Sequence, residues 1–128
     1  MPPALPLSVL IVEDNHDGAE TLAALLDIYG HTIRVAHAGA EALRLAGESA
    51  PDAVILDIGL PGMDGFDLAR ALIEMLPSRP LLVAVSGYTN MRERCWAAGI
   101  DHYYIKPVEP SVLGALLRAH AVTLAVPE

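Results

Sequence analysis

The stretch that decides the fold is AVILDIGLPGMDG, residues 53–65. Its first four residues, Ala53–Leu56, form an apolar run of the kind found in strands that are buried on both faces of a parallel sheet. Asp57 follows this run directly, and the Pro61-Gly62 pair predicts a loop. Asp64-Gly65 then predicts a turn and cap before a helix. The stretch therefore predicts a buried strand, a carboxylate at its end, a loop and a helix.

Four further apolar runs surround this strand at roughly even intervals. Two of them, at 7–12 and 81–85, are nearly continuous in Val, Ile, Leu and Ala, as expected of central strands in a parallel sheet. The other two are more polar or shorter, which is typical of edge strands. The five predicted strands are Leu7–Val12, Thr32–Ala36, Ala53–Leu56, Leu81–Val85 and Tyr103–Ile105.

Helical patterns separate the predicted strands. Apolar residues recur at every third or fourth position, and Gly30, Pro77 and Gly99 are stop signals. The segments with this pattern are 17–29, 40–46, 66–76, 91–98 and 112–120. Regular alternation of strand and helix predicts right-handed crossovers and an α/β sandwich of three layers. We expect one domain over residues 7–121, with tails at 1–6 and 122–128.

Composition narrows the class of protein. The chain has 128 residues and 53% apolar residues, enough for one packed domain, and its formal net charge is −8. Such an acidic balance argues against nucleic-acid binding, which needs clustered Lys and Arg. The single cysteine, Cys95, excludes an internal disulfide and suits a reducing compartment. Because no apolar run reaches the ~18 residues of a membrane span, we expect a cytoplasmic protein without a membrane partner.

Polar residues follow the predicted strands where each one ends. Glu13 and Asp14 follow the first strand, Asp57 the third, Ser86 the fourth, and Lys106 the fifth. Each of them has an ordinary interpretation when taken alone, as a turn residue, a cap or a surface charge. Ligands of an open parallel sheet, however, bind beyond the carboxyl ends of its strands. The sequence therefore predicts a site that joins three acids, a hydroxyl and the chain's only lysine.

The chemistry of this site follows from its charges. Two carboxylates about 4 Å apart repel by about 4 kcal/mol at an effective dielectric constant near 20, so three of them require a cation. Oxygen ligands suit Mg²⁺, whereas the absence of His and Cys from these positions disfavours zinc. Magnesium suggests phosphoryl chemistry, and a carboxylate can be its nucleophile. Asp57 is the candidate nucleophile, with Lys106 and Ser86 as contacts for the phosphoryl oxygens.

Five short motifs, in this order, resemble the receiver (response regulator) domain of two-component signalling across residues 7–120. The resemblance implies a flavodoxin-like (βα)5 fold with a five-stranded parallel sheet of order 2-1-3-4-5. DIGLPGMDG followed by SGY is most similar to receivers attached to hybrid sensor histidine kinases, so the chain would be a stand-alone receiver or part of a larger protein. The motifs are VEDN (12–15), DIGLPGMDG (57–65), SGY (86–88), AGID (98–101) and YYIKP (103–107).

The resemblance assigns a role to each residue of the acidic pocket. Asp57 would accept a phosphoryl group from a histidine kinase or a histidine phosphotransfer protein. Glu13, Asp14 and Asp57 would hold Mg²⁺, with the backbone carbonyl of Gly59 as a further ligand. Lys106 would pair with the phosphoryl group. The chain would thus be a signalling phosphoacceptor that promotes its own phosphotransfer and dephosphorylation, and not an enzyme.

The resemblance also implies a conformational switch. The Ser86 hydroxyl would move toward the phosphoryl group, and the Tyr103 ring would turn inward with it. This movement would change the face made by the fourth helix, fifth strand and fifth helix, so that output occurs by protein–protein contact. A homodimer through this face is allowed but not required. The Lys106-Pro107 bond is cis in the family.

Other functions fit the residues less well. A phosphatase of the haloacid dehalogenase type would carry a second Asp where Gly59 stands. A flavodoxin-like cofactor binder would need a phosphate loop in place of Glu13 and Asp14. A receiver that is not phosphorylated is disfavoured because all five site positions of the family are filled. For residues beside the site, we expect Tyr88 to shield the phosphoryl group from water, and Trp96 to be partly buried against a neighbouring helix.

Overall fold

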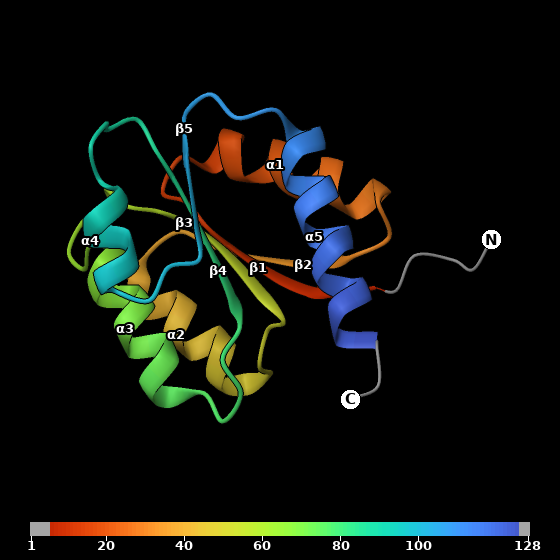
Figure 1. Ribbon diagram of the computed structural model, residues 1–128, viewed down its shortest axis with the longest axis horizontal. Coiled ribbons are helices and arrows are strands. Elements are labelled where there is room, and N and C mark those ends of the chain that lie inside the picture. The colour runs from red at the N-terminus through yellow and green to blue at the C-terminus, as the bar shows by residue number, and fades with distance from the viewer. Residues whose placement is uncertain (1–5, 126–128) are drawn as a thin grey trace.

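The computed structural model describes residues 6–125, and its centre is a sheet of five parallel strands (Figure 1). The strand order is β2-β1-β3-β4-β5, which confirms the predicted order. The central strands β1, β3 and β4 are almost wholly buried, while the edge strands β2 and β5 are partly exposed. The strands are β1 (Ser8–Val12), β2 (Thr32–Ala36), β3 (Ala53–Asp57), β4 (Leu81–Ser86) and β5 (His102–Ile105).

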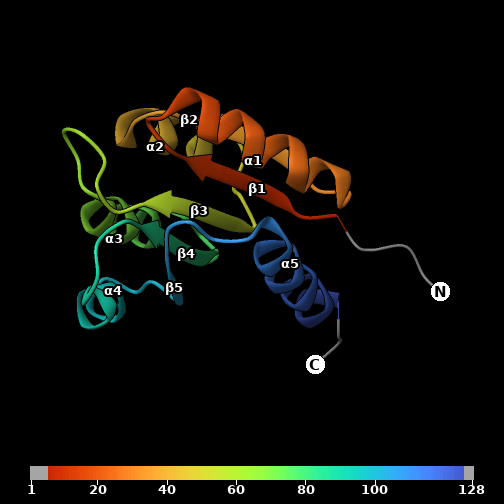
Figure 2. The ribbon, with the colours of Figure 1, turned by 90° about the horizontal axis from the view of Figure 1, so that it is seen from above.

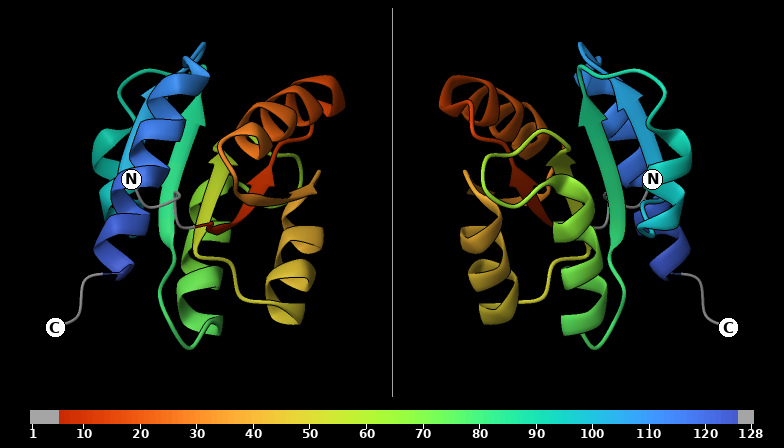
Figure 3. Two further views of the ribbon diagram at one scale, coloured as in Figure 1. Left: turned by 90° about the vertical axis from the view of Figure 1, so that its right-hand side faces the viewer. Right: turned by 90° about the vertical axis from the view of Figure 1, so that its left-hand side faces the viewer.

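Five helices cover the two faces of the sheet, as the alternation of strand and helix predicted (Figure 2). α1 and α5 pack on one face, and α2, α3 and α4 on the other. α1 and α5 lie in front in the left view of Figure 3, and α2 and α3 in the right view. In residues 6–125 no helix has the length and apolar character that crossing a membrane requires. The helices are α1 (His16–Ile28), α2 (Gly39–Glu48), α3 (Gly65–Met75), α4 (Arg92–Ala97) and α5 (Pro110–Ala125).

Two apolar clusters, one on each face of the sheet, form the core. Successive side chains of a strand point to opposite faces, so β1 contributes to both clusters. Leu10 and Val12 pack with α2, α3 and α4, whereas Val9 and Ile11 pack with α1 and α5. This double burial is the physical reason why the central strands are continuously apolar in sequence.

Several element ends differ from the sequence-based expectation. β3 and β4 each extend one residue further than predicted, so that Asp57 and Ser86 are the last residues of their strands. α5 continues to Ala125, and the predicted start of the C-terminal tail at residue 122 is therefore wrong. The last turn continues because Ala121 is buried against the core and the Thr123 hydroxyl donates to the Ala119 carbonyl at 3.1 Å. Of the predicted tails, residues 1–5 and 126–128 lie outside the described residues.

The register of the sheet brings the ends of its strands to one edge. Val12 of β1 pairs with Ala36 of β2 and with Leu56 of β3, so Glu13 leaves the sheet at the level of Asp57. Ser86 pairs with Ile105, and the Lys106 N–H donates to the Ser86 carbonyl at 2.8 Å. The backbone alone therefore brings the residues at the ends of four strands, Glu13, Asp57, Ser86 and Lys106, to the same edge of the sheet.

Candidate functional site

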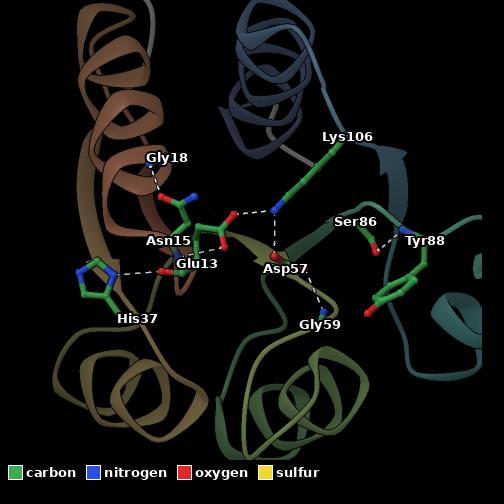
Figure 4. A network of polar contacts seen from close by, with 9 residues as sticks. All are labelled: Glu13, Asn15, Gly18, His37, Asp57, Gly59, Ser86, Tyr88 and Lys106. Atoms are coloured by element: carbon green, nitrogen blue, oxygen red, sulfur yellow. Dashed lines mark hydrogen bonds and ion pairs between the residues drawn. The ribbon is translucent and has the colours of Figure 1, made fainter.

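Lys106 joins two carboxylates at the centre of this edge (Figure 4). Its Nζ donates to Oε1 of Glu13 at 2.6 Å and to Oδ2 of Asp57 at 2.8 Å. Both carboxylates are largely buried, and the lysine side chain is 38% exposed. Burial acts to lower the pKa of Lys106, but the hydrogen bonds to Asp57 and Glu13 outweigh it and raise this pKa. The lysine therefore stays charged and holds Asp57 and Glu13 together.

Asp57 is oriented on its other side by the loop that follows it. The Gly59 N–H donates to Oδ1 of Asp57 at 2.9 Å, and the Gly65 N–H donates to the Ile58 carbonyl at 2.9 Å. Gly65 opens α3 in very close contact with the end of β3. A Cβ atom on Gly65 would lie 2.7 Å from Cα of Ile58 and 2.8 Å from the Asp57 carbonyl oxygen. Only glycine permits this approach, which anchors both ends of the loop beside Asp57.

The loop between β1 and α1 supplies the other two acids. Oε2 of Glu13 accepts from the Asn15 N–H at 3.3 Å, and the Asn15 side chain caps α1 by accepting from the Gly18 N–H at 3.0 Å. Burial raises the pKa of Glu13, and its hydrogen bond from Lys106 offsets part of this effect. Asp14 is exposed beside Glu13. The loop thus presents one partly buried and one exposed carboxylate.

The three carboxylates fit the donor set of a magnesium site. Glu13, Asp14 and Asp57 each offer an oxygen atom, and these atoms lie within 4.8 Å of one another. Hard oxygen donors that leave room for water are the ligands that Mg²⁺ prefers. Gly59 lies beside Asp57, as its hydrogen bond shows, and the role of its carbonyl as a further ligand stays a prediction.

A chain of contacts connects Ser86 with Tyr103. Ser86 is fully buried, and its Oγ accepts from the Tyr88 N–H at 3.0 Å. The carbonyl of the same residue, Tyr88, accepts a hydrogen bond from the Tyr103 hydroxyl. A Cβ atom on Gly59 would lie 3.3 Å from the Tyr88 ring, so the ring lies directly over Gly59. The Lys106-Pro107 peptide bond is cis.

A cavity of about 560 Å³ extends from this site under α1. Glu13, Asp57 and Lys106 line it at the acidic site, and apolar residues such as Leu22 and Val108 line it elsewhere. The cavity therefore borders the Asp57 carboxylate on the side of α1.

The structure also shows contacts that the sequence did not reveal. His37 hydrogen-bonds to the Glu13 carbonyl, and its ring stacks on that of His16 with centroids 3.7 Å apart. The sequence signal for this contact was the position of His37 directly after β2, because parallel pairing in register places the residues that follow β1 and β2 side by side. Trp96 was expected to be partly buried against a neighbouring helix, and this expectation is wrong: its side chain is 64% exposed on α4.

Comparison with known proteins agrees with this geometry. A family model described as the response regulator receiver domain matches residues 9–118. Response regulator MprA of Mycobacterium sp. (strain KMS) is 34% identical over 117 residues, 90% of this chain and 50% of that protein. Transcriptional regulatory protein AfsQ1 of Streptomyces coelicolor is 33% identical over 113 residues, 88% of this chain and 50% of that protein. The chain thus spans about half the length of these curated relatives.

Solved structures give the same result. A receiver domain (CheY-like) from Methylobacillus flagellatus has a TM-score of 0.80 and 32% identity, covering 91% of this chain and 99% of its own. A response regulator protein from Burkholderia pseudomallei, described with a phosphorylated aspartic acid, a calcium ion and citrate, has a TM-score of 0.79 and 29% identity, covering 91% and 69%. Together with the matching family model, these findings confirm the predicted family: the chain belongs to the response regulator receiver domains of two-component systems.

Proposed function

We propose that this receiver takes a phosphoryl group from the phosphohistidine of a histidine kinase or histidine phosphotransfer protein onto Asp57, in a reaction that depends on Mg²⁺. The observation that carries this proposal is the position of Asp57 between Lys106 and the acids of the β1–α1 loop. The phosphorylated aspartic acid described for the Burkholderia pseudomallei protein supports the same chemistry on a similar fold.

The transfer needs one nucleophile and no further covalent assistance from the chain. An oxygen of the Asp57 carboxylate attacks phosphorus, the P–N bond to the donor histidine breaks, and the departing imidazole keeps the electron pair and takes up a proton. Gly59 and Lys106 hold the carboxylate in place, and the lysine charge remains beside the phosphoryl oxygens. Mg²⁺ bound by Glu13, Asp14 and Asp57 would supply the remaining positive charge.

We propose that the aspartyl phosphate is later hydrolysed, so that the chain acts as a reversible signalling phosphoacceptor and not as an enzyme. Water attacks phosphorus, inorganic phosphate leaves, and the Asp57 carboxylate is restored. The Tyr88 ring lies over Gly59, next to the acceptor, and covers one approach for that water. We place this cycle in the cytoplasm, a location that stays a prediction, as does attachment to a hybrid sensor kinase.

The output surface is proposed to be the face formed by α4, β5 and α5. Phosphorylation would draw the Ser86 hydroxyl toward Asp57 and release the Tyr88 N–H that it now holds, and the Tyr88 carbonyl is bonded to Tyr103. Exposed apolar residues on this face, among them Trp96 and Ile105, offer a surface for a protein partner. A second copy of the chain is one such partner.

Phosphorylation with acetyl phosphate tests the acceptor. With Mg²⁺ present, the protein should gain one phosphoryl group in an intact-mass spectrum, and chelation of Mg²⁺ should prevent this gain. Asp57→Asn should abolish it, whereas Asp67→Asn, a change at an exposed position of α3, should leave it intact. Equal labelling of Asp57→Asn and the unchanged protein would show that Asp57 is not the acceptor.

A further inference from the structure

His37 is fixed against the loop that carries Glu13 and Asp14. Val12 pairs with Ala36, and the Glu13 N–H extends this pairing by donating to the Ala36 carbonyl at 3.0 Å. Nδ1 of His37 then lies 3.0 Å from the Glu13 carbonyl oxygen (Figure 4). A carbonyl can only accept, so Nδ1 carries the hydrogen and donates it. Both backbone groups of Glu13 are therefore held by the end of β2.

The His37 ring is itself supported from two directions. Its main-chain N–H donates to Oε1 of Glu41 at 2.7 Å, which ties the residue to the first turn of α2. Its ring stacks on that of His16, the first residue of α1, with an interplanar angle of 6°. His37 thus contacts the β1–α1 loop at both of its ends, at the Glu13 carbonyl and at His16.

The contact between His37 and the Glu13 carbonyl also affects the position of Asp14, whose side chain is exposed in the structure. The Glu13 carbonyl and the Asp14 nitrogen belong to one peptide plane, so a hydrogen bond that fixes the carbonyl also fixes the direction in which Asp14 leaves the loop. An exposed carboxylate without such support would lose more conformational freedom when it binds a metal ion.

We propose that His37 is a positioning residue for the metal-binding carboxylates. By donating to the Glu13 carbonyl while its ring stacks on His16, it holds the β1–α1 loop so that Glu13 and Asp14 face Asp57, and it thereby tightens the binding of Mg²⁺. The inference rests on the proposed magnesium-dependent function and adds to it a residue that touches neither the metal ion nor the phosphoryl group.

Calorimetric titration with Mg²⁺ at pH 8, where ordinary imidazoles are neutral, tests this role. His37→Phe keeps a ring that can stack on His16 but lacks the donor, and it should raise the Mg²⁺ dissociation constant about fivefold to tenfold. His37→Asn keeps a donor at the same distance from Cβ and should recover much of the affinity. His120→Phe, on α5 far from the loop, should bind Mg²⁺ like the unchanged protein.

Labelling by acetyl phosphate provides a second measurement. His37→Phe should need more Mg²⁺ for half-maximal labelling but should reach nearly the unchanged rate when Mg²⁺ is saturating, because Asp57 and Lys106 are intact. A folded His37→Phe protein with unchanged Mg²⁺ affinity, or a His37→Asn protein no better than His37→Phe, would overturn the proposal. If the unchanged protein bound Mg²⁺ but Asp57 were never labelled, the proposed function would fail and the role of His37 would stand.

A second variant keeps the proposal testable if His37→Phe does not fold. His16→Ala removes the stacked ring and leaves the His37 hydrogen bond and all three carboxylates in place. It should also weaken Mg²⁺ binding, with a melting temperature close to that of the unchanged protein. Unchanged affinity in a folded His16→Ala protein would contradict the proposed support of the loop.

Discussion

We predict that the Tyr88 side chain slows the hydrolysis of an aspartyl phosphate at Asp57. Its ring lies over Gly59, which has no side chain, and Gly59 donates to the acceptor carboxylate. Tyr88→Ala should open this side to water and speed dephosphorylation about threefold to tenfold, a barrier change of about 1 kcal/mol. Loss of mass label after removal of acetyl phosphate measures the rate. Tyr88→Phe keeps the ring and should dephosphorylate at nearly the unchanged rate, while an unchanged rate in Tyr88→Ala would exclude shielding.

His31, at the opposite end of the sheet, makes stability depend on pH. The side chain is buried, and its Nδ1 accepts from the Leu7 N–H at 3.1 Å, a bond that needs the neutral ring. Burial lowers the pKa of His31 in the folded state. As pH falls through about 6.5, the unfolded chain therefore binds a proton that the folded chain does not, and stability is lost until the lower folded pKa is passed.

Urea unfolding between pH 5 and pH 8 measures this effect. The contribution of His31 to the free energy of unfolding should fall with a slope of at most about 1.4 kcal/mol per pH unit. His31→Asn offers Leu7 a carbonyl oxygen that does not titrate, so the difference in stability between the two proteins should shrink or reverse in its favour toward pH 5. A difference that stays constant over this range would show that His31 does not titrate on unfolding.

At the scale of elements, the close contact between the start of α3 and the end of β3 fixes the position of Asp57. Gly65→Ala would put a methyl group within 3 Å of the backbone of Asp57 and Ile58, and both belong to rigid structure. We expect a loss of about 1–3 kcal/mol in the free energy of unfolding, measured in urea, together with slower labelling of Asp57. Gly47→Ala in α2 is the control, because nothing lies within 4 Å of its added Cβ. The control should stabilise the protein slightly, and equal effects of the two changes would contradict the packing argument.

The elements show which parts of the fold and site could be predicted from sequence. The buried strands were predictable because a strand that is buried on both faces needs a continuous apolar run. The site residues Asp57, Ser86 and Lys106 were predictable because they are the polar residues at the carboxyl ends of the predicted strands. Exposure of Trp96 was not predictable, because a helix of six residues has too little periodicity to define its face. The contact of His37 with Glu13 spans 24 residues and depends on the register of β1 with β2, which no local pattern encodes.

At the scale of the molecule, phosphorylation of Asp57 would have to change the conformation of the proposed output face, which is formed by α4, β5 and α5. Two contacts of the proposed path are present: the Ser86 hydroxyl accepts from the Tyr88 N–H, and the Tyr103 hydroxyl donates to the Tyr88 carbonyl. Tyr103 lies on β5 and packs against the same apolar cluster as Cys95 of α4. A movement of Ser86 would therefore be transmitted toward α4 through the backbone of Tyr88 and the ring of Tyr103.

The chain's only tryptophan reports on this path. Trp96 is exposed on α4, so its fluorescence senses the proposed output face and no other part of the molecule.

Beryllofluoride with Mg²⁺, which mimics a phosphoryl group on Asp57, should change this fluorescence in the unchanged protein. Ser86→Ala should still bind beryllofluoride, as measured by calorimetry, but should lose most of the change, because it lacks the hydroxyl that holds the Tyr88 N–H and is proposed to move toward Asp57. Ser78→Ala, an exposed serine before β4, should behave like the unchanged protein. A full fluorescence change in Ser86→Ala would show that the signal reaches α4 by another path.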